Sequence, residues 1–445
     1  MTPEPGPTPP GAGAPEPAAP EMEGRDYLRL LGLGALVGVP AAVVAIAFLS
    51  LVHWLEHWLW VSLPASMGLT TPPWWLIVAL PVVGAVLVWA ASTFLPGHGG
   101  HEPIYGLSMD PTPANYAAGV ALAALASLAF GAVLGPEAPL IALGSIVGVV
   151  VARWARVEGK SRQVLSMAGS MTAISALFGG PLVAGVMVTE AGASLGAALV
   201  PAMLPGLLGA AIGYTLIVGY GSWTGIPVEG LTVPNLPDYA TTRVVDLLAA
   251  VVIGLIVAIL VPAVRIVAHR LVVLRGRVGL GPVVVAGGLA IGVMAAVVQA
   301  AGGNYADILF SGQTSIPTLL AASGAWGLVA VLLVKALAYA ISLGSGFRGG
   351  PVFPAIFVGT AVAVVVGNLI DMSPTAAVAI GAACGMAAFT RLVVTSLMFA
   401  VLLTGVNGAG AIPAATLATV TAWIVAFVID RRRGPIAPPA TQPTG

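Results

Sequence analysis

The chain has 445 residues, of which 58% are apolar and only 8% are charged, and its mean hydropathy is +1.01. Soluble proteins carry about 25% charged residues, so this composition excludes a soluble fold and predicts an all-α integral membrane protein surrounded by lipid. The 17 basic and 17 acidic residues balance, which argues against nucleic acid as a partner, and the single cysteine, Cys384, excludes an intrachain disulfide.

The two ends of the chain have the composition of tails. Residues 1–25 are rich in Pro, Gly, Ala and Glu and have no basic stretch before the first apolar run, so we expect a disordered tail and not a signal peptide. Residues 431–445 begin with three arginines directly after the last apolar run. Under the positive-inside rule this places the C-terminus in the cytoplasm, and we expect both tails there.

Apolar segments fill the chain between the tails, at 28–52, 72–95, 114–133, 136–152, 163–178, 181–219, 243–268, 279–301, 323–343, 351–370, 373–389, 391–406 and 409–430. A straight transmembrane helix needs about 20 residues, and several of these segments are shorter and interrupted by Gly-Pro pairs. Broken helices are tolerated at membrane depth only where protein or a cavity surrounds the freed backbone. The Gly-Pro breaks are therefore where a site is expected.

One of these breaks occurs twice in the chain. GPEAPLIALG at 135–144 and GPVFPAIFVG at 350–359 share five of ten residues. The first copy is followed by a basic stretch at 153–162, whereas no basic residue follows the second copy before Arg391. The positive-inside rule then predicts opposite orientations, and so two inverted halves, 26–240 and 241–430. A second basic stretch, from Arg265 to Arg277, predicts another cytoplasmic loop.

The chemistry of such a break favours an anion. A helix that begins at mid-membrane leaves its first N–H groups without intrahelical partners and carries about half a positive charge there. Glycine lets the backbone approach an ion, and proline in the first turn loses no hydrogen bond. Glu137 is the only charged residue between Pro111 and Ala152. Its carboxylate would occupy the place of the anion, which predicts a gate; the alternative is a helix cap that serves stability alone.

Three stretches resemble the chloride channel and antiporter family known as CLC. VKALAYAISLGSGFRGGPVFPAIFVG at 334–359 is similar to the family's long glycine-rich signature, GPEAP at 135–139 to its gating-glutamate motif, and FGGPLVAGVMVTE at 178–190 to a third motif. GHGGHEP at 97–103 is the nearest counterpart of the family's G-S-G-I-P. The resemblance covers residues 28–430 and implies a CLC-like fold of two inverted halves with many tilted and broken helices.

The resemblance also implies a homodimer in a bacterial plasma membrane, with one anion path in each subunit and Glu137 as the gate. The anion-binding positions it implies are His98, Gly99, Gly135, Ser345, Gly346, Gly349, Gly350, Val352 and Phe353. His98 replaces the family's serine and would make conduction sensitive to pH near 6 to 7, whereas the alternative is that its side chain faces cytoplasmic water. The family's two N–H donors fall on Pro351 and Val352, and because proline has no N–H, one donor is missing unless the register shifts by one residue to Val352 and Phe353. The family's C-terminal tyrosine is missing, because Tyr339 is the last tyrosine.

Coupling to protons depends on the next acidic residue. Family antiporters carry a proton-relay carboxylate at the position of Ala191 here, with Glu190 directly before it as a possible substitute in the proton path. The apolar relay position favours a passive chloride channel over a chloride/proton antiporter. Because several anion-binding positions differ from the family pattern, fluoride and nitrate remain alternatives to chloride as the transported anion. Arg348, inside the glycine-rich signature, is a candidate for raising the local anion concentration.

Other readings of the polar residues are weaker. His53 and His57 have the i, i+4 spacing of a zinc site but no third ligand, so we expect no metal and no cofactor. Ser345 in GSG could be the nucleophile of an intramembrane hydrolase, but no histidine has a suitable context as its base. We therefore expect no catalytic residue and no enzyme. Lys335 and Arg391 could attract anions, or they could pair with carboxylates.

Overall fold

The structure, a computed structural model, describes residues 24–224, 231–322 and 324–433. Most of the predicted tails, at 1–23 and 434–445, lies outside the described residues. Gly24 and Arg25 already belong to the first helix, and Arg431 to Arg433 belong to the last one. The helices thus extend a few residues further into both ends than the composition predicted, because basic residues continue a helix as readily as apolar ones.

The first half consists of eight α-helices in the described residues: α1 (Gly24–His57), α2 (Leu63–Ser66), α3 (Trp74–Phe94), α4 (Ala117–Leu128), α5 (Glu137–Trp154), α6 (Gly159–Phe178), α7 (Pro181–Ala191) and α8 (Leu199–Thr224). The second half, in the part of the chain that the structure covers, has the same number: α9 (Val244–Val278), α10 (Leu280–Ala300), α11 (Ile316–Ala321), α12 (Ala325–Ser345), α13 (Val352–Gly367), α14 (Pro374–Thr390), α15 (Val393–Thr404) and α16 (Ile412–Arg433).

The two halves repeat one order of helices. In each, a Gly-Pro break precedes a helix of 18 or 16 residues (α5, α13), which is followed by helices of 20 or 17 (α6, α14), 11 or 12 (α7, α15) and 26 or 22 residues (α8, α16). The last glycine of each motif copy lies at a close contact between two helices. Gly144 packs against the backbone of α6 at Gly169, and Gly359 packs against α14 at Gly381. A side chain at either motif glycine would overlap that backbone, so the repeat reflects a close helix crossing made twice.

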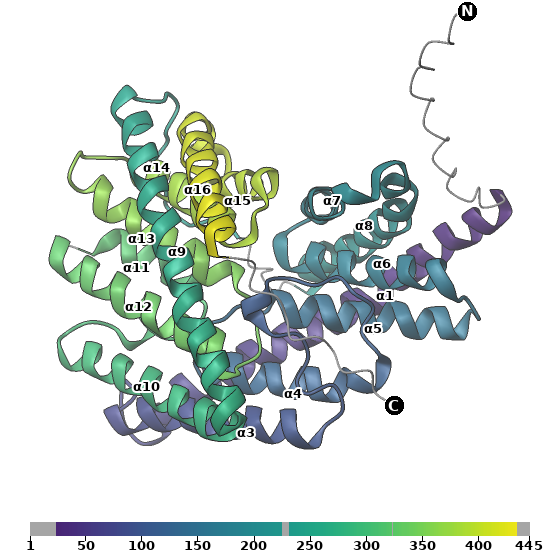
Figure 1. The fold of residues 1–445 in the computed structure, drawn as a ribbon, viewed down its shortest axis with the longest axis horizontal. Coiled ribbons are helices and arrows are strands. Elements are labelled where there is room, and N and C mark those ends of the chain that lie inside the picture. The colour runs from purple at the N-terminus through teal and green to yellow at the C-terminus, as the bar shows by residue number, and fades with distance from the viewer. Residues whose placement is uncertain (1–23, 225–230, 323, 434–445) are drawn as a thin grey trace, which may run out of the picture.

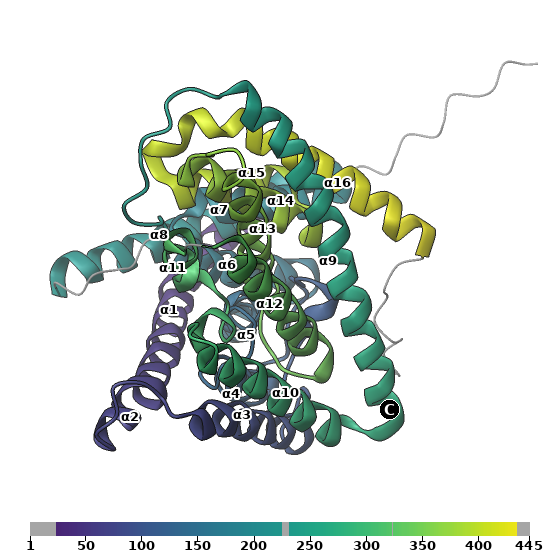
Figure 2. The ribbon, with the colours of Figure 1, turned by 90° about the vertical axis from the view of Figure 1, so that its left-hand side faces the viewer.

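The helices form a membrane domain with interlocked halves. Among the described residues, eight helical segments are long and apolar enough to cross a membrane, while α4, α7, α13 and α14 are shorter apolar helices. Figures 1 and 2 show α3 of the first half beside α10 of the second at the lower edge, and α16 lies against α9. This confirms the predicted all-α fold of tilted and broken helices.

One predicted loop is a helix instead. The basic residues Arg265, Arg270, Arg275 and Arg277 all lie on α9, which continues ten residues past the predicted end of its apolar segment. Charges in the last turns of a helix suit the negative end of its dipole, so they do not have to mark a loop. The segment predicted at 181–219 is also divided, into α7 and α8, with Ala193–Ala198 between them.

Candidate functional site

The two Gly-Pro copies meet directly. Gly135 donates its N–H to the carbonyl of Gly350 over 2.8 Å, and Gly350 donates to the carbonyl of Gly135 over 2.6 Å, as an isolated antiparallel pair. The helices that follow, α5 and α13, therefore begin at one point and run apart. Both glycines also border the Glu137 carboxyl group, which a side chain at either position would overlap. The paired glycines thus make room for one carboxylate between two helix N-termini.

The carboxylate of Glu137 lies at the start of α13. Its Oε1 accepts hydrogen bonds from the backbone N–H of Val352 at 2.5 Å and of Phe353 at 3.4 Å. Glu137 is fully buried, and its Oε2 has no hydrogen-bond partner among the described residues. Pro351 is the N-cap of α13 and contributes no N–H. The carboxylate therefore contacts the two N–H groups that a one-residue shift past Pro351 would bring into use, and anion binding by these groups stays a prediction.

A tyrosine hydroxyl borders the same helix end. Tyr339 on α12 is fully buried and donates its hydroxyl to the carbonyl of Pro351 over 2.6 Å. Its ring lies beside that of Phe389, with 6.1 Å between the centroids. The family's C-terminal tyrosine stays absent from this sequence, and no sequence pattern singles out Tyr339, because its contact with Pro351 forms only in the folded chain.

The remaining residues of the signature surround this point. Ser345 ends α12, is buried with no hydrogen-bond partner for its Oγ in the described part, and borders Gly287 of α10. Gly346 follows with a φ of 120°, which favours glycine, and turns the chain towards the break. Gly349 packs against Leu134, directly before Gly135. The contacts of these glycines bring the two backbones together. Their roles in anion binding stay a prediction.

Two histidines of GHGGHEP lie in different places. The His98 imidazole is exposed, with its Nδ1 3.2 Å from the carbonyl of Ser92. His101, three residues later, borders a cavity of about 10 Å³ together with Gly99, Ala138 and Arg348. That volume is about one water molecule. The family resemblance points to the first histidine of the motif, His98, whereas it is the second one, His101, that lies beside the start of α5.

Arg348 shares this cavity but is not a free charge. Its Nη1 lies 3.5 Å from Oε1 of Glu102, and Arg275 of α9 lies 2.5 Å from Oε2 of the same carboxylate. Burial alone would raise the pKa of Glu102, but the charges of Arg348 and Arg275 hold that pKa below its ordinary value. Arg348 also donates to the carbonyl of His98 over 2.9 Å, so the arginine fixes the loop before α4.

Comparison with known proteins identifies the family. The family model described as voltage gated chloride channel matches residues 106–426. The chain belongs to the CLC family. It is 28% identical over 362 residues to the "Putative ion-transport protein YfeO" of Salmonella paratyphi A, which covers 78% of this chain and 83% of the relative, and equally so to that of Salmonella typhimurium.

Two solved structures show the CLC fold. A slow cyanobacterial Cl⁻/H⁺ antiporter superposes with a TM-score of 0.74 at 16% identity, covering 90% of this chain and 95% of the other. A CLC-type fluoride/proton antiporter superposes with a TM-score of 0.68 at 19% identity, covering 91% and 97%. The fold predicted from the glycine-rich signature is therefore confirmed.

Glu190 of this CLC protein lies at a second helix N-terminus, the start of α15. One carboxylate oxygen accepts from the N–H of Val393 at 2.5 Å and of Val394 at 3.0 Å, and the other from the N–H and hydroxyl of Thr395 at 2.9 and 2.8 Å. The side chain thus joins the end of α7 to the start of α15. Both oxygens are occupied, so the geometry is that of a helix cap, and a role in a proton path stays a prediction.

Lys335 does not lie at either helix end. This fully buried residue of α12 donates its Nζ to the carbonyls of Leu309 at 2.6 Å and Phe310 at 3.0 Å, and it lies 5.0 Å from the centre of the Phe357 ring. It therefore fixes the loop before α11.

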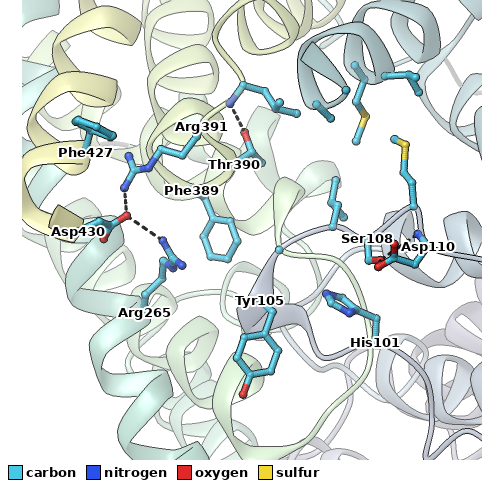
Figure 3. Close-up of a pocket in the computed structure, with 18 of the residues that line it drawn as sticks. His101, Tyr105, Ser108, Asp110, Arg265, Phe389, Thr390, Arg391, Phe427 and Asp430 are labelled. Carbon is cyan, nitrogen blue, oxygen red and sulfur yellow. Dashed lines mark hydrogen bonds and ion pairs between the residues drawn. The ribbon is translucent and has the colours of Figure 1, made fainter. Parts of the chain in front are cut away.

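A large open pocket leads towards the site from one side. It has a volume of about 810 Å³ and lies between the loop after α3, the end of α7, the end of α14 and the end of α16 (Figure 3). His101 lines both this pocket and the small cavity beside Arg348. Burial lowers the pKa of His101 from its ordinary value near 6.5. A neutral imidazole, which has one N–H to donate, therefore stands between the pocket and the start of α5.

Proposed function

We propose that this CLC protein carries a small monovalent anion of the chloride type across a bacterial plasma membrane, through a path in each subunit that Glu137 gates. The observation that carries the proposal is the Glu137 carboxylate on the N–H groups of Val352 and Phe353. Two N–H groups at a helix N-terminus form a site for one negative charge, and an anion can take that site only after the carboxylate leaves it.

The path that we propose enters through the 810 Å³ pocket, passes His101 and Arg348, and reaches the start of α13. We propose that His101 takes the role that the sequence gave to His98, because His101 lines both cavities whereas His98 lines neither. Amide and imidazole N–H groups hold an anion without a full charge, which suits binding that must also release. The Tyr339 hydroxyl, which donates its one hydrogen to the carbonyl of Pro351, holds the start of α13 in place beside this path.

Passive conduction is the mode that we favour. Ala191, at the relay position, lines the pocket without a carboxylate, and the neighbouring Glu190 already accepts four hydrogen bonds. The alternative is exchange with protons, which is favoured by the two structural neighbours because both are proton antiporters. The same neighbours are a chloride and a fluoride antiporter, so the transported anion can be chloride, fluoride or nitrate.

The expected arrangement in the membrane is a homodimer with both termini in the cytoplasm. Arg29 near the start of α1 donates to the carbonyl of Ala155 at the end of α5, where the basic stretch 153–162 begins. The start of α1 therefore lies on the same side as that basic stretch, which the positive-inside rule places in the cytoplasm. The similarity to Salmonella proteins supports a bacterial plasma membrane.

The test is efflux of chloride, fluoride and nitrate from proteoliposomes under an imposed anion gradient, with internal pH followed at the same time. Glu137→Gln and Glu137→Ala remove the competing charge, so we expect flux at least about tenfold faster and independent of pH, because each hydrogen bond to a charged group contributes about 1.5–3 kcal/mol. The matched control is Glu158→Gln, an exposed carboxylate at the start of α6. Unchanged flux in both Glu137 variants would refute the gate, and uphill proton movement in the wild type would establish exchange.

A second comparison tests the assignment of the histidine. We expect His101→Ala to slow anion flux several-fold, because the N–H between the two cavities is lost, and His98→Ala to have a smaller effect, because its imidazole lies outside them. The reverse order of effects would return the role to His98.

A further inference from the structure

Two arginines of the large pocket share one carboxylate. Arg265 of α9 places its Nη1 3.4 Å from Oδ2 of Asp430, and Arg391 at the end of α14 places its Nη2 2.6 Å from the same oxygen. Figure 3 shows both guanidinium groups converging on Asp430 at one wall of the pocket. The three residues come from α9, α14 and α16, so only the tertiary fold brings them together.

The charges of this cluster do not balance. Only 15% of the Arg265 side chain and 22% of the Arg391 side chain are exposed, whereas Asp430 is 37% exposed. Two mostly buried positive charges thus face one partly solvated negative charge. Arg265 Nε and Arg391 Nη1 are also buried without a hydrogen-bond partner in the described residues. Buried charges need a partner of opposite sign, so one positive charge remains to be compensated.

The other charged groups of the pocket do not supply that compensation. Arg431, next to Asp430 on α16, adds a further positive charge and lies over the Phe427 ring. Asp110 lies across the pocket, where it accepts a hydrogen bond from Ser108 over 2.7 Å (Figure 3). His101, on the same far wall, has a pKa lowered by burial and brings no charge at neutral pH. The wall around Arg265 and Arg391 is therefore positive.

We propose that Arg265 and Arg391 form a binding site for a small monovalent anion in this pocket. This site is separate from the position that the Glu137 carboxylate occupies at the start of α13. The site rests on the proposed function, since its occupant is the transported ion before or after it passes His101. Guanidinium groups are weakly hydrated and present several N–H donors, so they bind an anion without stripping a tightly held water shell from the protein. Asp430 is the internal competitor, as its carboxylate takes one side of both guanidinium groups.

The pocket around the pair allows exchange with solvent. Its volume of about 810 Å³ is far larger than a halide ion, and it is open, so an anion at the arginines keeps part of its hydration shell. A positive wall at such an entrance raises the local anion concentration and the rate of entry. The site is expected to act on the anion concentration that half-saturates transport from this side, and not on the maximal rate.

The experiment locates bromide directly. Crystals of the full-length protein grown in sodium bromide are measured at the bromine absorption edge, and we expect an anomalous peak within hydrogen-bonding distance of Arg265 and Arg391. The peak should disappear in Arg265→Gln and remain in Arg270→Gln, an exposed arginine of the same helix. No peak at the pair in the wild type would overturn the proposal. A peak in a protein that shows no anion flux would keep this site and refute the proposed function instead.

Transport kinetics give a second, independent readout. With the pocket side facing the varied anion, we expect the half-saturating concentration to rise about tenfold in Arg265→Gln and Arg391→Gln at low ionic strength, with the maximal rate retained. Asp430→Asn removes the competitor and should lower the same concentration. If Arg391→Gln does not fold, Arg391→Lys keeps the charge and should retain binding. An equal change in Arg270→Gln, or no opposite sign in Asp430→Asn, would contradict the site.

Discussion

Glu137 and Glu190 are two carboxylates of the first half that each lie at the N-terminus of a helix of the second half. Glu190 accepts four hydrogen bonds at the start of α15 and uses both of its oxygens. Glu137 accepts two at the start of α13, one of them long at 3.4 Å, and its second oxygen has no partner in the described residues. The residue type and the helix dipole are the same at both ends, but the number of donors differs.

This difference separates a structural cap from a group that can move. Each hydrogen bond to a charged group contributes about 1.5–3 kcal/mol, so releasing Glu190 costs far more than releasing Glu137. The surroundings add to the contrast, because Gly135 and Gly350 border the Glu137 carboxyl group so closely that a side chain at either position would overlap it. The incomplete hydrogen bonding of Glu137 therefore supports the proposal that Glu137 is the gate and that Glu190 is a cap.

The largest expected effect is on stability at Glu190. Glu190→Gln replaces one accepting oxygen with an NH₂ group that faces the donors of Thr395, so we expect a loss of about 3 kcal/mol in unfolding free energy. Glu137→Gln keeps an acceptor for Val352 and should change stability by about 1 kcal/mol or less. Thermal unfolding in detergent micelles, followed by tryptophan fluorescence, measures both. Equal losses in the two variants would remove the distinction between cap and gate.

A third carboxylate, Glu102, extends the comparison because it interacts with the charged side chains of two arginines and not with the N–H groups of a helix N-terminus. Since Arg348 and Arg275 lower its pKa in the folded protein, its stabilisation is complete above the unfolded-state pKa of about 4.3 and is lost as the pH falls through the lower folded-state value. We expect wild-type unfolding temperature to drop below about pH 4.3 and Glu102→Gln to lack that part of the drop, at a cost of about 2 kcal/mol at pH 7. Parallel pH profiles for the two proteins would contradict this account.

The smallest expected effect is at Tyr339, which has no counterpart at the start of α15. Tyr339→Phe removes the hydrogen bond to Pro351 without changing the ring packing, so stability should fall by about 1 kcal/mol. If the hydroxyl also contacts the transported anion, the half-saturating anion concentration should rise, whereas a purely structural hydroxyl would leave it unchanged. The control is Tyr105→Phe, a half-buried tyrosine of the pocket rim whose hydroxyl is not assigned to the path.

Sequence reasoning reached the fold because the relevant features are local or periodic. Apolar runs, Gly-Pro breaks and the asymmetry of basic residues specify broken helices in two inverted halves, and the glycine-rich signature specified the family. It also placed Glu137 at the break and offered Val352 and Phe353 as the donors that a one-residue shift past Pro351 would bring into use, and these are the N–H groups that the carboxylate contacts. A missing proline N–H is a covalent fact and needs no coordinates.

The tertiary structure decided which of several similar residues face each other. His98 and His101 are equivalent in a short motif, but only His101 borders the cavities. Tyr339 reaches the start of α13 from α12, and Arg265 and Arg391 share Asp430 from helices far apart in the chain. The sequence by itself determined that the protein lies in a lipid bilayer, where its helices are interrupted, and that its two halves form an inverted repeat. These features follow from composition and backbone chemistry. Only the packed helices determined the site's neighbours, because side chains from distant segments meet in space and not along the chain.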